Sequence, residues 1–83
     1  MSLPKSLDFS TAPAALDDAD KLIASGTLDL SAVTRADSAG VALLLELTRR
    51  AQARSIQLKI KGANPQIRSL LEFFKLSEVL ALV

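Results

Sequence analysis

Apolar and polar positions fall into short blocks along the chain, and their spacing alternates between that of a strand and that of a helix. Residues 27–33 contain a short apolar run, broken by Asp29 and Ser31, which is typical of a strand. Residues 56–61 alternate Ile, Leu and Ile with polar residues, which predicts a strand with one solvated face. Residues 6–9 alternate in the same way and predict a short or edge strand.

Three other stretches have helical spacing. The first begins with a capping hydroxyl at Thr11, has Pro13 in its first turn and ends near Gly26. The second covers about residues 38–54, and its predicted core stripe is Val41, Leu44, Leu45, Thr48 and Ala51. The third opens with Asn64 and Pro65, and its predicted buried face is Ile67, Leu70, Leu71 and Phe74. Residues 76–83 are apolar enough to return as a short strand or a helical turn.

This alternation of strands and helices predicts an α/β fold with right-handed crossovers and an at least partly parallel sheet. We expect a small mixed sheet of about four strands. Because residues 56–61 leave one sheet face wet, the helices should lie mainly on the other face. At 83 residues, the chain fits a single domain, 1–83.

The composition argues against most catalytic sites. The chain has no histidine and no cysteine, so it lacks the usual general base, thiol nucleophile and zinc ligands. Its three glycines stand alone and form no phosphate-binding loop. The longest apolar run, residues 41–45, is too short to span a bilayer. We therefore expect a cytoplasmic binding module that is not an enzyme, has no metal or cofactor and does not insert into the membrane.

Charge is distributed unevenly although the net charge is only +1. Residues 1–40 carry three basic and six acidic side chains, whereas residues 41–83 carry seven basic and three acidic ones. Solvated helix and strand faces are the favoured explanation, and a basic docking surface is the alternative. With three Phe and no Trp or Tyr, the chain does not have the stacking platform of a nucleic-acid-binding protein.

The start of the second helix is the strongest candidate site. Asp37 or Ser38 can cap this helix, which would present the Ser38 hydroxyl at the positive end of the helix dipole. Such a position suits holding or adding a phosphate. Ser38 could instead serve only as the cap. In the functional interpretation Ser38 is phosphorylated, and repulsion by Asp37 would make the phosphate change a docking surface rather than the fold.

A partner-binding surface is the second candidate site. Leu43 and Phe73 lie off the apolar stripes of their helices, and Leu47 lies at the edge of its stripe. With Arg50 and Arg54 nearby, these residues could form an apolar centre with a charged rim. The alternative is that they are ordinary exposed apolar residues. If they bind a partner, Leu43→Asp or Phe73→Asp should leave the thermal melt unchanged and abolish partner capture.

Three segments in order resemble one known family. Residues 29–47 have the sequence DLSAVTRADSAGVALLLEL, which resembles the signature segment of STAS domains. Residues 7–26 are similar to the strand and first helix of the same family, and residues 56–76 to its later strand and Asn-Pro helix. The resemblance covers nearly the whole chain. Within the family, the runs VTRADSAGVALLLEL and GANPQIRSLLEFFKL most resemble MlaB-type subunits of the phospholipid-transport ABC system.

This resemblance implies one preferred function and two alternatives. It implies a non-catalytic cytoplasmic subunit that binds and supports the ATPase of an Mla-type ABC transporter, and so associates with the inner membrane through that complex. The alternative is an anti-sigma-factor antagonist, which binds an anti-sigma kinase and carries its phosphorylated residue at the position of Ser38. Asp37, Ser38 and Gly40 match the signature turn. A nucleotide-binding STAS domain is a third alternative, favoured only by the helix N-terminus.

One departure from the family concerns the N-terminal strand. STAS domains usually begin with a strand before the one that matches residues 7–9, and this chain has almost no residues for it. We therefore expect the usual first strand to be absent or shortened. A bare sheet edge can pair with another chain, so the sequence leaves two alternatives, a homodimer through that edge and a monomer, which light scattering distinguishes.

Overall fold

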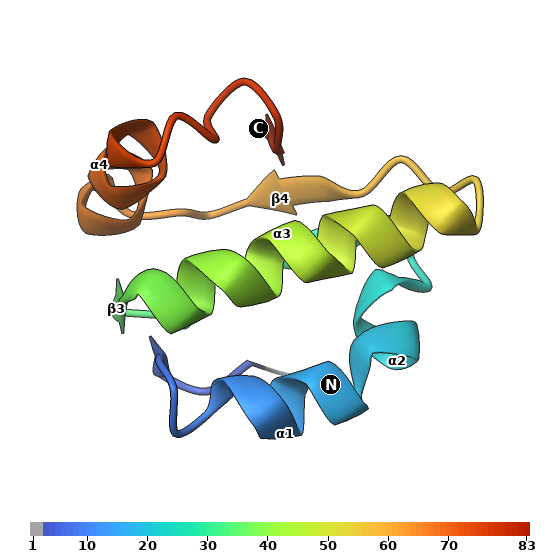
Figure 1. Cartoon of the computed structure of the whole chain (residues 1–83), viewed down its shortest axis with the longest axis horizontal. Coiled ribbons are helices and arrows are strands. Elements are labelled where there is room, and N and C mark those ends of the chain that lie inside the picture. Colours follow the sequence, from blue (N-terminus) through green and yellow to red (C-terminus); the bar gives the residue numbers. More distant parts are fainter. Residues whose placement is uncertain (1–2) are drawn as a thin grey trace.

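The computed structural model describes residues 3–83 and shows short strands alternating with helices (Figure 1). The family-typical first strand would lie before Ser6, and residues 1 and 2 are outside the described part. In chain order the elements are β1 (Ser6–Leu7), α1 (Ala12–Asp17), α2 (Ala19–Ile23), β2 (Thr27–Asp29), β3 (Arg35–Ala36), α3 (Ser38–Ala53), β4 (Lys59–Lys61), α4 (Pro65–Phe73) and β5 (Ala81–Leu82). The α/β fold class is confirmed.

The strands form two small sheets in which every pairing among the described residues is parallel. β1 pairs with β3, and β4 lies between β2 and β5. We expected a mixed sheet of about four strands, so the structure is more parallel and more divided than the pattern predicted. For residues 76–83 the sequence predicted either a short strand or a helical turn. The structure has the strand β5 there, which pairs with β4.

The predicted strand over residues 27–33 is wrong in its second half. β2 ends at Asp29, the chain bends where the Val33 N–H donates to the Leu30 carbonyl over 2.9 Å, and β3 follows at residues for which we predicted neither strand nor helix. The bend occurs because the two halves have different partners. The Leu30 N–H donates to the carbonyl of Lys61 in β4, whereas the Thr34 N–H donates to the carbonyl of Lys5 next to β1.

Local signals predicted the helices well, with two exceptions. The predicted Thr11 cap is wrong, because the Thr11 hydroxyl makes no capping bond to α1 and bonds Ser6 and Asp8 instead. α3 spans nearly all of the predicted 38–54, and α4 begins as predicted, with the Asn64 side chain accepting a 2.9 Å bond from the Ile67 N–H. The first predicted helix is instead divided into α1 and α2 at Asp18. There the backbone leaves helical geometry and the Asp18 N–H donates to the Ala15 carbonyl over 3.1 Å, in the manner of a turn.

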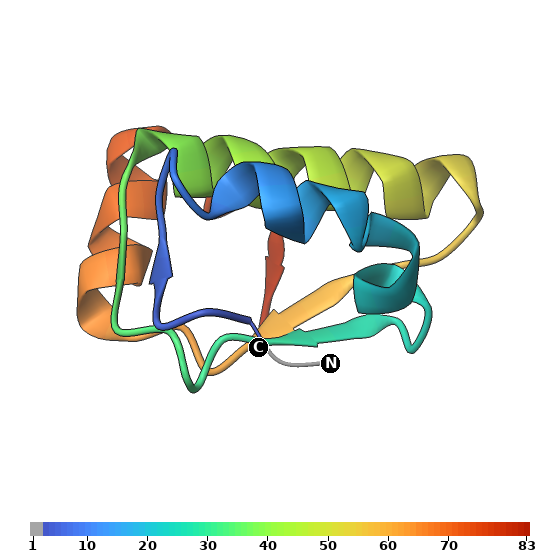
Figure 2. The same cartoon turned by 90° about the horizontal axis from the view of Figure 1, so that it is seen from below.

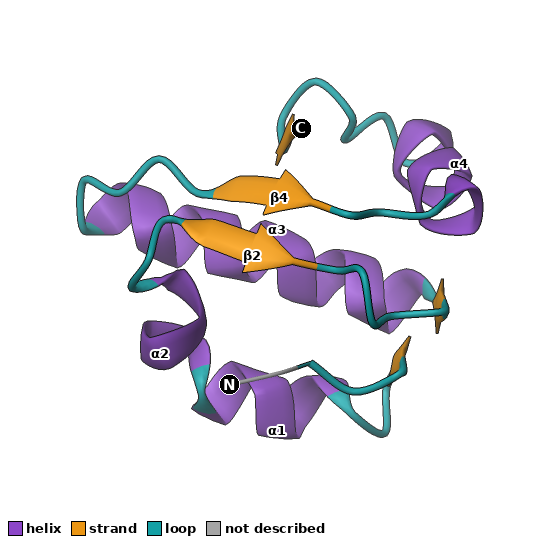
Figure 3. Ribbon diagram, turned by 180° about the vertical axis from the view of Figure 1, so that it is seen from behind, coloured by secondary structure: helices purple, strands orange, loops and turns teal. Residues whose placement is uncertain are grey.

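Helices α1, α2 and α3 form a layer on one side of the β2–β4 strands, and α4 crosses one end of the molecule (Figure 2). The opposite face of the strands has no helix over it (Figure 3). The outward side chains there, Thr27, Asp29, Lys59 and Lys61, are exposed, as the alternating pattern predicted. The core lies between the strands and the helical layer and includes Leu7, Ile23, Leu30, Leu44, Leu47, Ile60, Ile67 and Leu71.

None of the helices within residues 3–83 has both the length and the apolarity that crossing a bilayer requires.

Candidate functional site

Asp37 caps the N-terminus of α3. Its carboxylate accepts hydrogen bonds from the Ala39 N–H at 2.9 Å and from the Gly40 N–H at 3.2 Å. Ser38 is the first residue of the helix and is exposed, and within residues 3–83 its hydroxyl has no hydrogen-bond partner. The alternative in which Ser38 serves as the cap is therefore wrong. Its hydroxyl is presented at the positive end of a 16-residue helix.

Gly40 fixes the approach of α3 to β1. It is buried, and a Cβ at this position would overlap the Leu7 carbonyl oxygen and stand 2.8 Å from the Leu7 Cβ. The same carbonyl accepts a 3.0 Å hydrogen bond from the Asp37 N–H. A side chain at position 40 would push the helix off the strand, so the Asp37–Gly40 spacing sets both the cap and this close contact.

The start of α4 holds β3 from its other side. The Gln66 side-chain oxygen accepts from the Ala36 N–H at 3.1 Å, and its amide nitrogen donates to the Ala36 carbonyl at 3.1 Å. The Asn64 amide donates to the Thr34 carbonyl at 2.9 Å. Sequence reasoning missed Gln66, because nothing local indicates that its amide pairs with a backbone 30 residues away.

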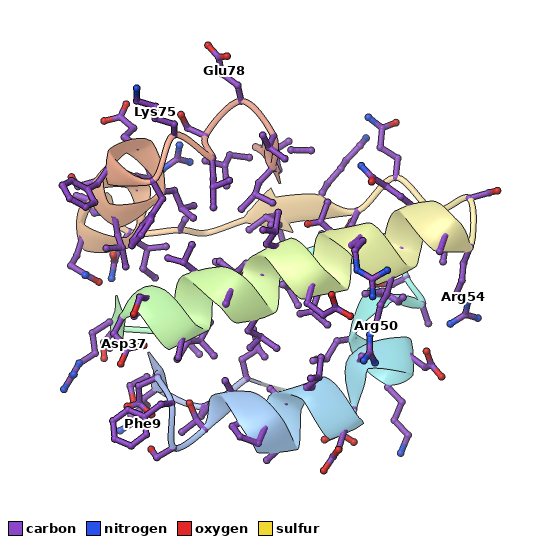
Figure 4. All side chains as sticks on the ribbon, viewed as in Figure 1. Phe9, Asp37, Arg50, Arg54, Lys75 and Glu78 are labelled. Carbon is purple, nitrogen blue, oxygen red and sulfur yellow. The ribbon has the colours of Figure 1, made fainter. Side chains whose placement is uncertain are left out.

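Phe9 lies at the same end of the molecule as Asp37 (Figure 4) and is 79% exposed. The turn that carries it is tightly bonded to Asp8, whose carboxylate accepts from the Ser10 N–H at 2.9 Å and from the Ser10 hydroxyl at 2.6 Å. Bonds from Ser10, the backbone and the Ser6 hydroxyl lower the pKa of Asp8 to about 2. The sequence placed Phe9 in a strand, so this exposed aromatic residue was missed.

An open groove lies between α1 and α3, next to this turn. Its volume is about 540 Å³, and we call it the α1–α3 groove; its lining is Phe9, Ala12, Pro13, Leu16, Ala39, Ala42, Leu43 and Glu46. Seven of these eight side chains are apolar. The groove ends at Glu46, where Arg49 and Arg50 both bond the carboxylate and hold its pKa at about 2.

Two of the predicted partner contacts belong to the core. Leu43 is 4% exposed and Leu47 is fully buried, whereas Leu45, which we placed in the core stripe, is 40% exposed. The reason is that α3 packs against α1 and α2 as well as against the strands, so its buried face is wider and rotated toward the α1 side. Leu43→Asp should therefore unfold the chain, contrary to the initial prediction.

The remaining predicted contacts do not form one surface. Phe73 is 79% exposed, as its off-stripe position predicted, and packs edge-on against Phe74, with ring centroids 5.4 Å apart. Phe74, expected in the core, is 42% exposed. Figures 1 and 4 show α4 at the end where α3 begins, whereas Arg50 and Arg54 lie toward the other end. Arg54 there bonds Asp20 at 3.3 Å, so the expected charged rim around Phe73 is wrong.

The outer edge of β1 is partly occupied by its own chain. The Thr11 hydroxyl donates to the Ser6 carbonyl at 2.9 Å and accepts from the Asp8 N–H at 3.0 Å. These are backbone groups on the side of β1 that faces away from β3. A homodimer through this edge stays a prediction, and it would have to replace the Thr11 bonds.

A comparison with protein-family models identifies the family. The model described as "Mlab, STAS domain" matches residues 1–83. The chain belongs to the STAS domain family. A search of the curated proteins finds no match for it. STAS domains are generally non-enzymatic, and the Asp37–Gly40 turn of this STAS domain offers a cap, an exposed hydroxyl and a close helix–strand contact rather than a set of converging catalytic groups.

Proposed function

We propose that this STAS domain is a non-catalytic cytoplasmic subunit that binds and supports the ATPase of a phospholipid (Mla-type) ABC transporter. The observation that carries the proposal is the match of residues 1–83 to the MlaB-type family model. In this function the domain associates with the inner membrane through the transporter complex. It contacts the ATPase with its helical layer, at the end that carries Ser38.

The geometry of that end supports a protein partner. Phe9 and Ser38 are both exposed at that end of the molecule. Hydrogen bonds hold the backbone that carries each of them. A preorganised surface loses little conformational entropy on binding, which favours recognition by a protein. The apolar α1–α3 groove adjoins both residues and supplies area that a partner can bury.

The test begins with capture. The tagged chain is used as bait in a lysate of the source organism, and the recovered ABC ATPase is then purified with and without it. We expect a stable complex with the ATPase and its membrane permease, and higher ATP turnover or complex yield in the presence of the chain. An ATPase that assembles and turns over equally well without the chain would contradict the proposal.

The second candidate function is that of an anti-sigma-factor antagonist switched by phosphorylation at Ser38. The exposure of the Ser38 hydroxyl favours it, because Asp37 does the capping and leaves the hydroxyl available to a kinase. In that case the same capture should recover a small histidine-kinase-like protein. Ser38→Glu should then abolish binding to this kinase, whereas Ser38→Ala should bind it constitutively.

The two functions make opposite predictions for Ser38→Ala. For the transporter subunit, this variant should fold but support the ATPase less well than the unchanged chain. For the antagonist, it should be fully active and insensitive to ATP. Measuring both readouts on one preparation separates the two functions.

A further inference from the structure

We propose that the α1–α3 groove binds one amphipathic α-helix of the partner protein, anchored on Phe9 and carrying acidic side chains on its flank over α3 and basic side chains on its flank over α1. The inference rests on the proposed function in taking the partner to be the ATPase, and the experiment below separates the two. It is carried by the apolar lining of the groove, the exposure of Phe9 and the opposite charges of the two rims.

The lining of the groove calls for an apolar occupant. Apart from Glu46 at one end, its side chains are Phe9, Ala12, Pro13, Leu16, Ala39, Ala42 and Leu43. Phe9 is 79% exposed, and the turn that carries it is held by hydrogen bonds to Asp8. An exposed aromatic side chain on a hydrogen-bonded turn beside an apolar groove has the properties of a binding hot spot.

The backbone chemistry of the groove favours a helix over a strand. α1 and α3 use their own peptide groups in helical bonds, and the nearby outward groups of β1 are bonded to Thr11. An extended segment would thus bury unpaired backbone groups in the groove, which costs free energy. A helix satisfies its own peptide groups and needs only an apolar stripe. Figure 1 shows α1 running alongside α3, and a third helix would lie along the groove that these two helices line.

The rims of the groove carry opposite charges. On α1, Asp17 is exposed and follows Pro13 of the lining by four residues, so it lies on the solvent side of that rim. On α3, Arg49 follows Ala42 by seven residues and lies on the opposite rim. Glu46 does not cancel this positive rim, because Arg49 and Arg50 share its single carboxylate. A helix in the groove therefore meets one net positive charge at the Arg49 end of α3 and the negative charge of Asp17 on α1.

The experiment uses three synthetic 18-residue helical peptides with the same leucine stripe. One has glutamates on one flank and lysines on the other, the second has only glutamates and the third only lysines. Binding is followed by fluorescence anisotropy, and the site is mapped by amide NMR shifts of the full chain. We expect the mixed peptide to bind at least about tenfold more tightly than either uniform peptide, with shifts at Phe9 and Ala42. Because a helix can lie in the groove in either direction, the mirror-image flank order is not a useful control.

Two variants sharpen the test. Phe9→Asp should weaken the mixed peptide at least about tenfold, whereas the matched Phe73→Asp, equally exposed on α4, should leave its affinity unchanged. Arg49→Glu makes both rims acidic, so it should shift the preference to the lysine peptide. Equal affinity for all three peptides, no binding of any, or amide shifts confined to another face would each overturn the inference. A dimer of the chain that Phe9→Asp dissociates would also overturn it, because a second copy would then fill the groove.

The ATPase itself separates this inference from the proposed function. Loss of ATPase binding by Phe9→Asp with retention by Phe73→Asp supports both. An ATPase that binds both variants equally leaves the proposed function standing and overturns the groove as its docking site. Selective binding of the mixed peptide without any captured ATPase supports the groove, assigns it to another protein and refutes the transporter function.

Discussion

Gly40 on α3 and Leu7 on β1 are in direct backbone contact, with no room between them for a side chain. A Cβ on Gly40 would overlap the Leu7 carbonyl oxygen and lie 2.8 Å from the Leu7 Cβ. The contact joins the start of the longest helix to a two-residue strand. It explains why a glycine occurs inside the first turn of a helix, where an alanine would otherwise be favoured by about 1 kcal/mol.

Gly40→Ala should therefore destabilise the chain. The gain in helix propensity is outweighed by the clash with the Leu7 backbone, and we expect a net loss of about 1–3 kcal/mol in the free energy of unfolding. Urea unfolding followed by circular dichroism measures it. Ala42→Gly serves as the control for propensity alone and should cost about 1 kcal/mol. A Gly40→Ala variant more stable than the unchanged chain would show that α3 can move away from β1.

Removing the Asp37 side chain should lower the stability of the fold, whereas removing the Ser38 hydroxyl should not. Asp37→Ala leaves the Ala39 and Gly40 N–H groups without their acceptor, which should cost about 1 kcal/mol. Asp37→Asn keeps a capping oxygen and should retain most of the stability. Ser38→Ala should stay within about 0.5 kcal/mol of the unchanged chain, as is usual for exposed positions. Chemical unfolding of the three variants decides between the residues, and a larger loss at Ser38 would contradict the assignment.

Gln66 should behave as a structural residue although its side chain lies on the surface. Gln66→Ala removes both hydrogen bonds to the Ala36 backbone and should cost about 1–3 kcal/mol, because two partly buried backbone groups lose their partners. Hydrogen exchange should show the Ala36 amide losing protection in this variant. The exposed Gln52→Ala is the matched control and should change neither stability nor that amide.

Substitutions at Leu43 and at Phe73 should have very different effects on the melting temperature. Leu43→Asp buries a carboxylate in the core beside α1 and should prevent folding at ordinary temperatures. Phe73→Asp replaces a side chain that is 79% exposed and should leave the melting temperature nearly unchanged. Circular dichroism melts of both variants are sufficient. A folded Leu43→Asp protein would restore the initial assignment of Leu43 to the surface.

Stability should fall in acid, because two carboxylates have depressed pKa values in the folded chain. The Ser10 hydroxyl bond lowers the pKa of Asp8 from 3.8 to about 2, and the Arg49 and Arg50 bonds lower that of Glu46 from 4.5 to about 2. Each group therefore stabilises the fold fully above its unfolded-state pKa and loses this contribution as the pH falls toward 2. The melting temperature should drop between about pH 4.5 and 2.

Two variants test whether Asp8 and Glu46 cause the fall in melting temperature at low pH. Glu46→Gln and Asp8→Asn should each flatten part of the pH dependence, because each removes a proton uptake that accompanies unfolding. The contribution of Glu46 to the pH dependence should be smaller at high salt, since its ion pairs with Arg49 and Arg50 are on the surface.

The sequence predicted those parts of the fold that depend on local chemistry. α3 and α4 begin where Asp37 and Asn64 indicate, because a capping side chain bonds N–H groups only two or three residues away. The bare sheet face was predicted from the alternation of Lys59 and Lys61 with Ile60, since the side-chain period of a strand does not depend on distant residues.

The parts that were missed depend on partners distant in the chain. β3 exists because β1 lies beside it, and its sequence alone reads as a turn. Leu43 is buried because α1 covers that flank of α3, which no periodicity within α3 can show. Likewise, the exposure of Phe9 follows from the Asp8 turn, and a two-residue alternation could not distinguish that turn from a strand.

The hydrogen bonds that hold β3 join residues far apart in the sequence. Thr34 reaches back 29 residues to Lys5, and Ala36 reaches forward 30 residues to Gln66. Closing such loops is entropically costly, so these bonds should form late, after the local turns of α3 are in place. The Ser38 hydroxyl is therefore set in its final position only once both the N-terminal strand and α4 have docked. A partner that recognised this serine in its finished setting would thereby reject chains that are only partly folded.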